Sequence, residues 1–115
     1  ICTNPDLIVN RGDKQEYCAG TLAEVFKSLG GEVIYFGKPH PEIYNFCVKK
    51  NETILVIGDN IRTDIKGANN MKLDSLFIIN GIHKKDFINL QKQDYDKVLE
   101  KYKVNTNYYQ KELVW

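Results

Sequence analysis

The sequence has no excess of charge of either sign, with 16 lysine and arginine residues against 15 aspartate and glutamate residues. This balance does not favour nucleic acid or an anionic membrane as the main partner. No apolar run approaches the roughly 20 residues that a membrane-spanning helix needs, and no secretory signal peptide is recognisable. A length of 115 residues allows one domain with a single core. We therefore expect one domain that binds neither nucleic acid nor a membrane.

Cysteine and histidine are also scarce. Three widely spaced cysteines, Cys2, Cys18 and Cys47, are accompanied by only two histidines. An odd number of cysteines without C-x-x-C spacing indicates neither a disulfide framework nor a zinc site. Reduced cysteines that pack in the interior of a cytoplasmic protein fit this pattern best. We therefore expect a cytoplasmic location.

The pattern of apolar residues predicts alternating helices and strands. Helices are expected over residues 21–31, 41–51, 61–70 and 94–103. Strands are expected over residues 32–37, 53–59, 75–80 and, at a sheet edge, 106–115. The strands at 53–59 and 75–80 are apolar without alternation, which is typical of strands buried on both faces. This order predicts an α/β fold with a parallel sheet and right-handed crossovers.

Charged residues follow two of the predicted strands. Lys38 comes after strand 32–37, Asp59 closes strand 53–59, and Asp64 lies five residues further on. In open parallel sheets, sites form at the carboxyl ends of the strands. The two acids alone fit either a capped helix or a magnesium site of hard oxygen ligands. The lysine at the same edge favours a site that neutralises a transferring phosphoryl group.

Two longer segments carry a family resemblance. The sequence GKPHPEIY, residues 37–44, followed by VIGDNIRTDIKGANN, residues 56–70, resembles the haloacid dehalogenase (HAD) superfamily of phosphohydrolases. The segments TNPD, YCAGTLAE and LFIINGIH resemble its class IIA, NagD-like branch. The resemblance implies a three-layer Rossmann-like parallel sheet. Residues 1–115 would form the C-terminal part of one core domain, incomplete because the N-terminal nucleophile strand and the cap are absent.

The resemblance also implies roles for three charged residues. Asp59 would bind Mg²⁺ directly. Asp64 would orient a metal-bound water or Lys38. The ammonium of Lys38 would steady the nucleophile and the transferring phosphoryl group. Lys38 matches the third motif of the family, and the two acids match its fourth.

Four further residues are candidates for the same cleft. By the resemblance, Asn4 and Asp6 would lie near the junction of cap and core, although a local Asn-Pro-Asp turn explains them equally well. His40 either faces the cleft or begins a helix, and Asn60 either lines the site or is solvated.

Arg11-Gly12-Asp13 spells an adhesion tripeptide, but we expect it to be a polar turn.

The family's first motif, D-x-D at the end of an apolar strand, has no counterpart in this sequence. The letters DYD at 94–96 open a polar helix instead.

The resemblance therefore implies the C-terminal segment of a Mg²⁺-dependent phosphohydrolase that cleaves a small phosphorylated metabolite through an aspartyl-phosphate. By itself this segment would be inactive. The exposed sheet would pair with a complementing N-terminal chain or a second copy. A non-catalytic Mg²⁺-binding or dimerising module, left by a split or decayed gene, is the alternative.

Overall fold

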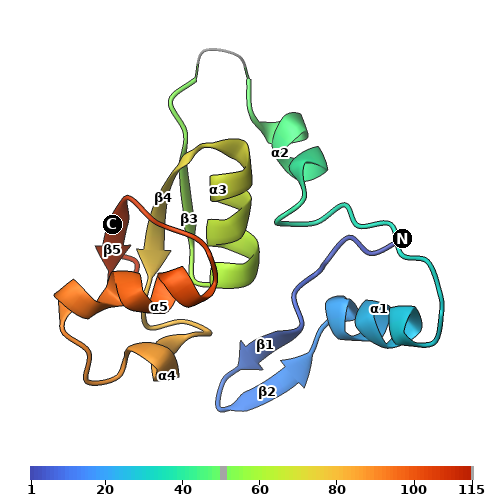
Figure 1. Cartoon of the computed structure of the whole chain (residues 1–115), viewed down its shortest axis with the longest axis horizontal. Helices are drawn as coiled ribbons and strands as arrows, with labels where there is room; N and C mark the ends of the chain where they lie inside the picture. Colours follow the sequence, from blue (N-terminus) through green and yellow to red (C-terminus); the bar gives the residue numbers. More distant parts are fainter. Residues whose placement is uncertain (50–51, 115) are drawn as a thin grey trace.

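A computed structural model describes residues 1–49 and 52–114, and Figure 1 shows its arrangement. The strands are β1 (Ile8–Arg11), β2 (Lys14–Tyr17), β3 (Leu55–Gly58), β4 (Asp74–Ile78) and β5 (Tyr108–Gln110). The helices are α1 (Ala19–Ser28), α2 (Pro41–Cys47), α3 (Lys66–Met71), α4 (Lys84–Phe87) and α5 (Tyr95–Lys101). A π turn, η1 (Ile61–Ile65), precedes α3, and a 3₁₀ turn, η2 (Lys92–Asp94), precedes α5. No helix in these residues is long and apolar enough to cross a membrane.

The main sheet has the order β3-β4-β5, and both pairs of strands are parallel. Gly58 lies opposite Phe77, and Phe77 lies opposite Tyr109. Parallel neighbours need a long crossover, which η1 and α3 provide between β3 and β4, and α4 and α5 between β4 and β5. The expected parallel α/β fold is confirmed.

The helices build the core against one face of this sheet. Phe77 of β4 is fully buried, and its ring centroid lies 5.2 Å from that of Phe87 in α4 and 6.4 Å from that of Tyr109 in β5. The other buried members of the core are Ile61, Ile65, Ile79, Val98, Leu99 and Val104. Removal of this apolar surface from water is the main stabilising contribution, at about 25 cal/mol per Å².

The opposite face of the sheet is open. The side chains of Leu55, Ile57 and Tyr108 are 45%, 40% and 55% exposed. The expectation that strand 53–59 is buried on both faces is wrong for this chain, because nothing among residues 1–49 and 52–114 covers that face or pairs beyond β3. The radius of gyration of 15.0 Å exceeds the roughly 13 Å of a compact domain of this length. The sheet is incomplete, as the resemblance implied.

Several boundaries differ from those expected. The strand predicted over 32–37 is reduced to a single parallel bridge between Cys2 and Tyr35, because it has no further neighbour in the described part of the chain. The helix predicted over 41–51 ends at Cys47, and Asn51 lies outside the described residues. The last strand is limited to Tyr108–Gln110, and Trp115 also lies outside the described residues.

An antiparallel hairpin precedes α1 and was not predicted. It pairs β1 with β2, and Arg11 lies opposite Lys14. Gly12 has a φ of +61°, which suits a two-residue hairpin turn. The adhesion-like tripeptide is therefore a polar turn, as expected.

Candidate active site

Asp59 directly follows β3, at the carboxyl end of the sheet. Its Oδ2 accepts a hydrogen bond of 2.9 Å from the backbone N–H of Ile82, in the loop after β4. Gly81 allows this approach, because a Cβ there would collide with the Asp59 carboxylate. The ends of two neighbouring strands are thus joined at one carboxylate.

The π turn places the second acid beside the first. Asn60 begins this turn, and its Oδ1 accepts a bond of 3.0 Å from the N–H of Arg62. The N–H of Asn60 donates to Oδ2 of Asp64 at 3.1 Å. Asn60 is therefore the cap of the turn, which leaves Asp59 available for another role. Single π turns are frequent at functional sites.

Lys38 forms an ion pair with Oδ1 of Asp64. The Asp64 side chain is 8% exposed and that of Lys38 is 46% exposed. Burial alone would lower the pKa of Lys38, but the hydrogen bond and charge of Asp64, with weaker effects of Asp6 and Asp59, raise that pKa above its ordinary value. Lys38 therefore carries a full positive charge at neutral pH.

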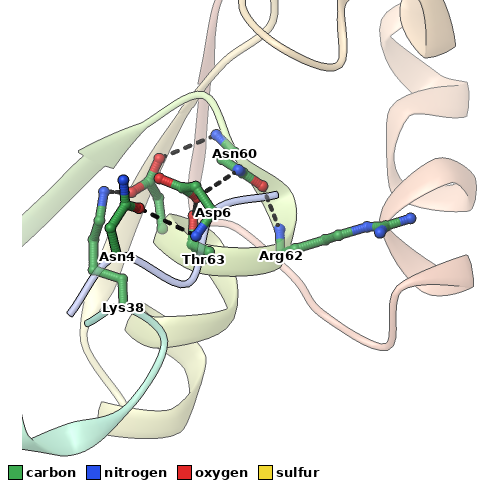
Figure 2. A network of polar contacts seen from close by, with 7 residues as sticks. Asn4, Asp6, Lys38, Asn60, Arg62 and Thr63 are labelled. Atoms are coloured by element: carbon green, nitrogen blue, oxygen red, sulfur yellow. Dashed lines mark hydrogen bonds and ion pairs between the residues drawn. The ribbon is translucent and has the colours of Figure 1, made fainter. Parts of the chain in front are cut away.

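Asp6 reaches the same turn from the N-terminal end of the chain (Figure 2). Its Oδ1 accepts a hydrogen bond of 2.8 Å from Nδ2 of Asn60 and one of 2.7 Å from Oγ1 of Thr63. The backbone N–H of Asp6 donates to Oδ1 of Asn4 at 3.2 Å. Asn4 thus lies next to the site through Asp6.

The side chains of His40 and Arg62 do not line the site with Lys38 and Asp59. His40 occupies the position before α2 and makes no side-chain capping bond. Its ring stacks on that of Tyr35, with centroids 5.2 Å apart. The Arg62 side chain extends away from Lys38 in Figure 2, and its guanidinium lies 5.6 Å from the ring centroid of Tyr102.

Lys38 and Asn60 line a cleft of about 300 Å³, to which the hairpin contributes Ile8, Val9 and Asn10. Asp6, Asp59 and Asp64 all line this cleft. Among the described residues, however, no group of three or more acidic, histidine or cysteine side chains is arranged to hold a metal ion. Both oxygens of Asp64 and one of Asp6 are already engaged.

The donor set therefore fits an oxygen-preferring cation that keeps most of its water. Magnesium usually binds in this way, through one or two carboxylates. Only one hydrogen bond to the Asp59 carboxylate is found within the described part of the chain, and it involves Oδ2. Gly81 keeps the space beside this carboxylate free of a side chain. Asp59 is the acid best placed to bind a cation.

Three contributors were not selected from the sequence. Thr63 is 4% exposed and contacts Asp6, and Gly81 and Ile82 approach Asp59. Thr63 is a polar residue on the inward side of the turn, between Ile61 and Ile65, and that position is a recognisable signal. Nothing local marks Ile82, because its contact uses only the backbone.

Comparisons with known proteins identify the family of the chain. A family model described as HAD-hydrolase-like matches residues 35–104. The ribonucleotide monophosphatase NagD of Escherichia coli K12 is 33% identical over 92 residues, which is 76% of this chain and 36% of that protein. A haloacid dehalogenase-like hydrolase from Brucella suis 1330 has 32% identity and a TM-score of 0.74, over 96% of this chain and 42% of that one.

A possible sugar phosphatase from Cytophaga hutchinsonii has the same fold, with a TM-score of 0.70 at 21% identity. The chain spans about a third of the length of the curated NagD relatives, since it covers 36% of them. The family model and the two relatives at 32% and 33% identity confirm the resemblance found in the motifs. The chain belongs to the HAD-like hydrolases, and it corresponds to part of a NagD-like member of that family.

Proposed function

We propose that this chain supplies part of the active site of a Mg²⁺-dependent class IIA phosphatase. Residues 1–115 would be the C-terminal part of one core domain, and the substrate would be the phosphomonoester of a small metabolite. The observation that carries this proposal is the contact of Lys38 with Asp64 beside Asp59, at the carboxyl ends of parallel strands. A cation and acids at this place are the groups that a phosphoryl site needs.

In the proposed site, Asp59 would provide a carboxylate oxygen to Mg²⁺. When bound, the ion neutralises charge on the phosphoryl group and holds it in place. The hydrogen bond from the N–H of Ile82 fixes the plane of the Asp59 carboxylate. Oδ1, to which no hydrogen bond is found among the described residues, would be available to the ion.

Asp64 acts on the site through Lys38. Its two oxygens are held by the ammonium of Lys38 and by the N–H of Asn60, so the acid is fixed on both sides. An ammonium has three N–H donors, and Asp64 engages one of them. Within the described residues the remaining donors of Lys38 make no hydrogen bond, so they would be available to phosphoryl oxygens.

The covalent nucleophile would come from outside this sequence, because the sequence has no counterpart of the family's D-x-D motif and Lys38 and Asp59 would only neutralise charge. The unpaired edge of β3 and the open sheet face support the proposal that an N-terminal segment, supplied by a complementing chain, pairs there. A second copy of this chain is the other candidate for that edge. The 115-residue chain alone is therefore expected to be inactive.

A binding or assembly module is the second candidate function. It is favoured by the incomplete ligand set at Asp59 and by the exposed apolar residues of β3. In this role the chain would bind Mg²⁺ or dimerise without catalysis. The free cysteines, Cys2, Cys18 and Cys47, support a reducing, cytoplasmic setting for either function.

Hydrolysis of p-nitrophenyl phosphate in the presence of Mg²⁺ tests the proposal. We expect no turnover by the 115-residue chain, and turnover by the complete product of its gene or by the chain joined to a D-x-D-bearing partner. Asp59→Asn should abolish that turnover, whereas Asp13→Asn at the hairpin tip should leave it unchanged. Turnover that survives Asp59→Asn would contradict the proposed phosphatase site. Absence of turnover with every partner would favour the binding module.

A further inference from the structure

We infer that Asp6 is a positioning residue for the carboxylates of this site. It acts through Asn60 and Thr63, the two side chains that it holds on the π turn. The inference rests on the proposed function, since it concerns the acids that would bind and orient the metal ion and Lys38. It adds a residue from the far N-terminal end of the chain to that site.

The contacts of Asp6 are long-range. Its Oδ1 receives the hydrogen bonds of 2.8 Å from Asn60 and 2.7 Å from Thr63, which lie 54 and 57 residues away in the sequence. A local Asn-Pro-Asp turn accounts only for the contact with Asn4. A charged acceptor makes such bonds about twice as strong as neutral ones. Asp6 is therefore a tertiary anchor as well as a turn residue.

The bond from Asp6 fixes the orientation of the Asn60 amide. An asparagine side chain has a donor end and an acceptor end. Because Asp6 takes Nδ2, the opposite end, Oδ1, points to the N–H of Arg62 at 3.0 Å. This capping bond starts the turn, and the backbone N–H of Asn60 then donates to Asp64. Loss of Asp6 removes the constraint that selects this orientation.

Thr63 gives Asp6 a second hold on the same turn. It precedes Asp64 directly and is 4% exposed, so its hydroxyl needs a partner inside the protein. Asp6 is that partner. Since Asn60 begins the turn and Thr63 lies within it, one carboxylate oxygen fixes the position of Thr63 relative to the start of the turn.

The segment that carries Asp6 is held by α1 and by Cys18, the residue before it. Oγ1 of Thr21 donates to the carbonyl oxygen of Leu7 at 2.6 Å, and the N–H of Cys18 donates to the same oxygen at 2.9 Å. A Cβ at Gly20 would collide with the carbonyl oxygens of Pro5 and Asp6, so α1 packs directly on this segment. The segment is therefore a fixed support for the turn.

The test compares Asp6→Ala with Asp13→Ala in the full 115-residue chain. Both changes remove one carboxylate, but Asp13 lies exposed in the hairpin turn. Two quantities are measured: NMR shifts of the Asn60 side-chain amide and of backbone amides 60–65 without metal, and Mn²⁺ affinity by electron paramagnetic resonance. We expect Asp6→Ala to move these resonances and to weaken Mn²⁺ binding about 10-fold, the range for ligand-supporting residues. Asp13→Ala should leave the resonances of Asn60 and of amides 60–65 in place. It should change the Mn²⁺ affinity by less than about 2-fold.

A milder pair of variants tests the same contact in case Asp6→Ala does not fold. Thr63→Ser keeps the hydroxyl that donates to Asp6, and Thr63→Val removes it with little change of shape. We expect Thr63→Ser to behave as the wild type and Thr63→Val to shift Asn60 in the same direction as Asp6→Ala.

Three results would overturn the inference: unchanged resonances in Asp6→Ala, equal effects of Asp6→Ala and Asp13→Ala, or equal behaviour of the two Thr63 variants. If the wild type binds no Mn²⁺, the proposed metal role of Asp59 fails. The role of Asp6 is then decided by the metal-free resonances.

Discussion

The ammonium of Lys38 and the carboxylate of Asp64 are in contact although they are 26 residues apart in the sequence. Lys38 precedes α2, whereas Asp64 lies in the π turn after β3. The pair therefore joins the segment before α2 to the first crossover of the sheet, at its carboxyl end. It also places a permanent positive charge next to Asp59, in a cleft that the hairpin partly closes.

Removal of the Lys38 charge should destabilise the chain. Lys38→Met leaves the buried Asp64 carboxylate without its cation. Loss of a partner from a buried pair costs about 3–5 kcal/mol. Because Lys38 is about half exposed and solvent screens the pair, we expect about 1–2 kcal/mol. The free energy of unfolding in urea measures the effect.

Lys97→Met is the matched control, because Lys97 pairs with Asp94 at the surface and its side chain is 73% exposed. We expect this change to cost less than about 0.5 kcal/mol. Equal losses for the two lysines would show that the Lys38–Asp64 pair is only another surface contact.

Truncation of the Tyr44 hydroxyl should stabilise the chain. Tyr44 is 8% exposed, and its Oη has no hydrogen-bond partner within residues 1–49 and 52–114. An unsatisfied buried polar group costs about 1–3 kcal/mol, so Tyr44→Phe should raise the free energy of unfolding by about 1 kcal/mol. Tyr109→Phe should lower it, because Oη of Tyr109 bonds to Asp96. A destabilised Tyr44→Phe variant would contradict this account.

Stability should fall at alkaline pH. Burial, with the nearby charge of Asp64, raises the pKa of Tyr44 from 10.0 to about 12. The pKa of Tyr44 is higher in the folded chain than in the unfolded chain. The contribution of the neutral Tyr44 side chain to the free energy of unfolding is therefore complete below pH 10 and is lost as the pH rises towards 12. Burial and Asp96 also raise the pKa of Tyr109.

Urea unfolding at successive pH values, with tyrosinate absorbance, measures this loss. We expect a smaller decline between pH 10 and pH 12 in Tyr44→Phe, since one of the shifted groups is absent. An identical decline in the wild type and in the variant would exclude Tyr44 as its source.

The open face of the sheet should promote association of the isolated chain. Exposed strands with unpaired edges and apolar side chains are association-prone. Ile57 lies on β3 and is 40% exposed, so Ile57→Lys should lower the fraction of oligomer in sedimentation velocity. Ile88→Lys, at a residue 54% exposed after α4, should have little effect. A wild type that is monomeric at all concentrations would contradict the prediction.

The sequence was sufficient for the elements whose pattern is local. The strands β3 and β4 follow from apolar runs and α5 from helical spacing, and Phe77 of β4 packs in the same core as Val98 and Leu99 of α5. The predicted burial of Leu55 and Ile57 failed for a physical reason. Their pattern reflects a covered sheet face, and nothing in the described part of the chain covers it.

The hairpin could not be predicted in the same way. All four residues of β2 are exposed, so neither face of this strand needs apolar side chains. The sequence of β2 therefore has no alternation of apolar and polar residues. At the site, Lys38, Asp59 and Asp64 were selected because each follows a predicted strand or begins the next helix. The bond of Thr63 to Asp6 crosses 57 residues, and no local pattern encodes it.

A titration of the ¹⁵N-labelled chain with Mn²⁺ tests the central claim most directly, since it locates a bound cation by paramagnetic line broadening. The account predicts that broadening is centred on Asp59 and the loop at Gly81–Ile82, that Mg²⁺ competes with it, and that Asp59→Asn removes it while Asp13→Asn does not. Broadening that is centred elsewhere, or that persists unchanged in Asp59→Asn, would contradict the assignment of this cleft as a metal-dependent phosphoryl site.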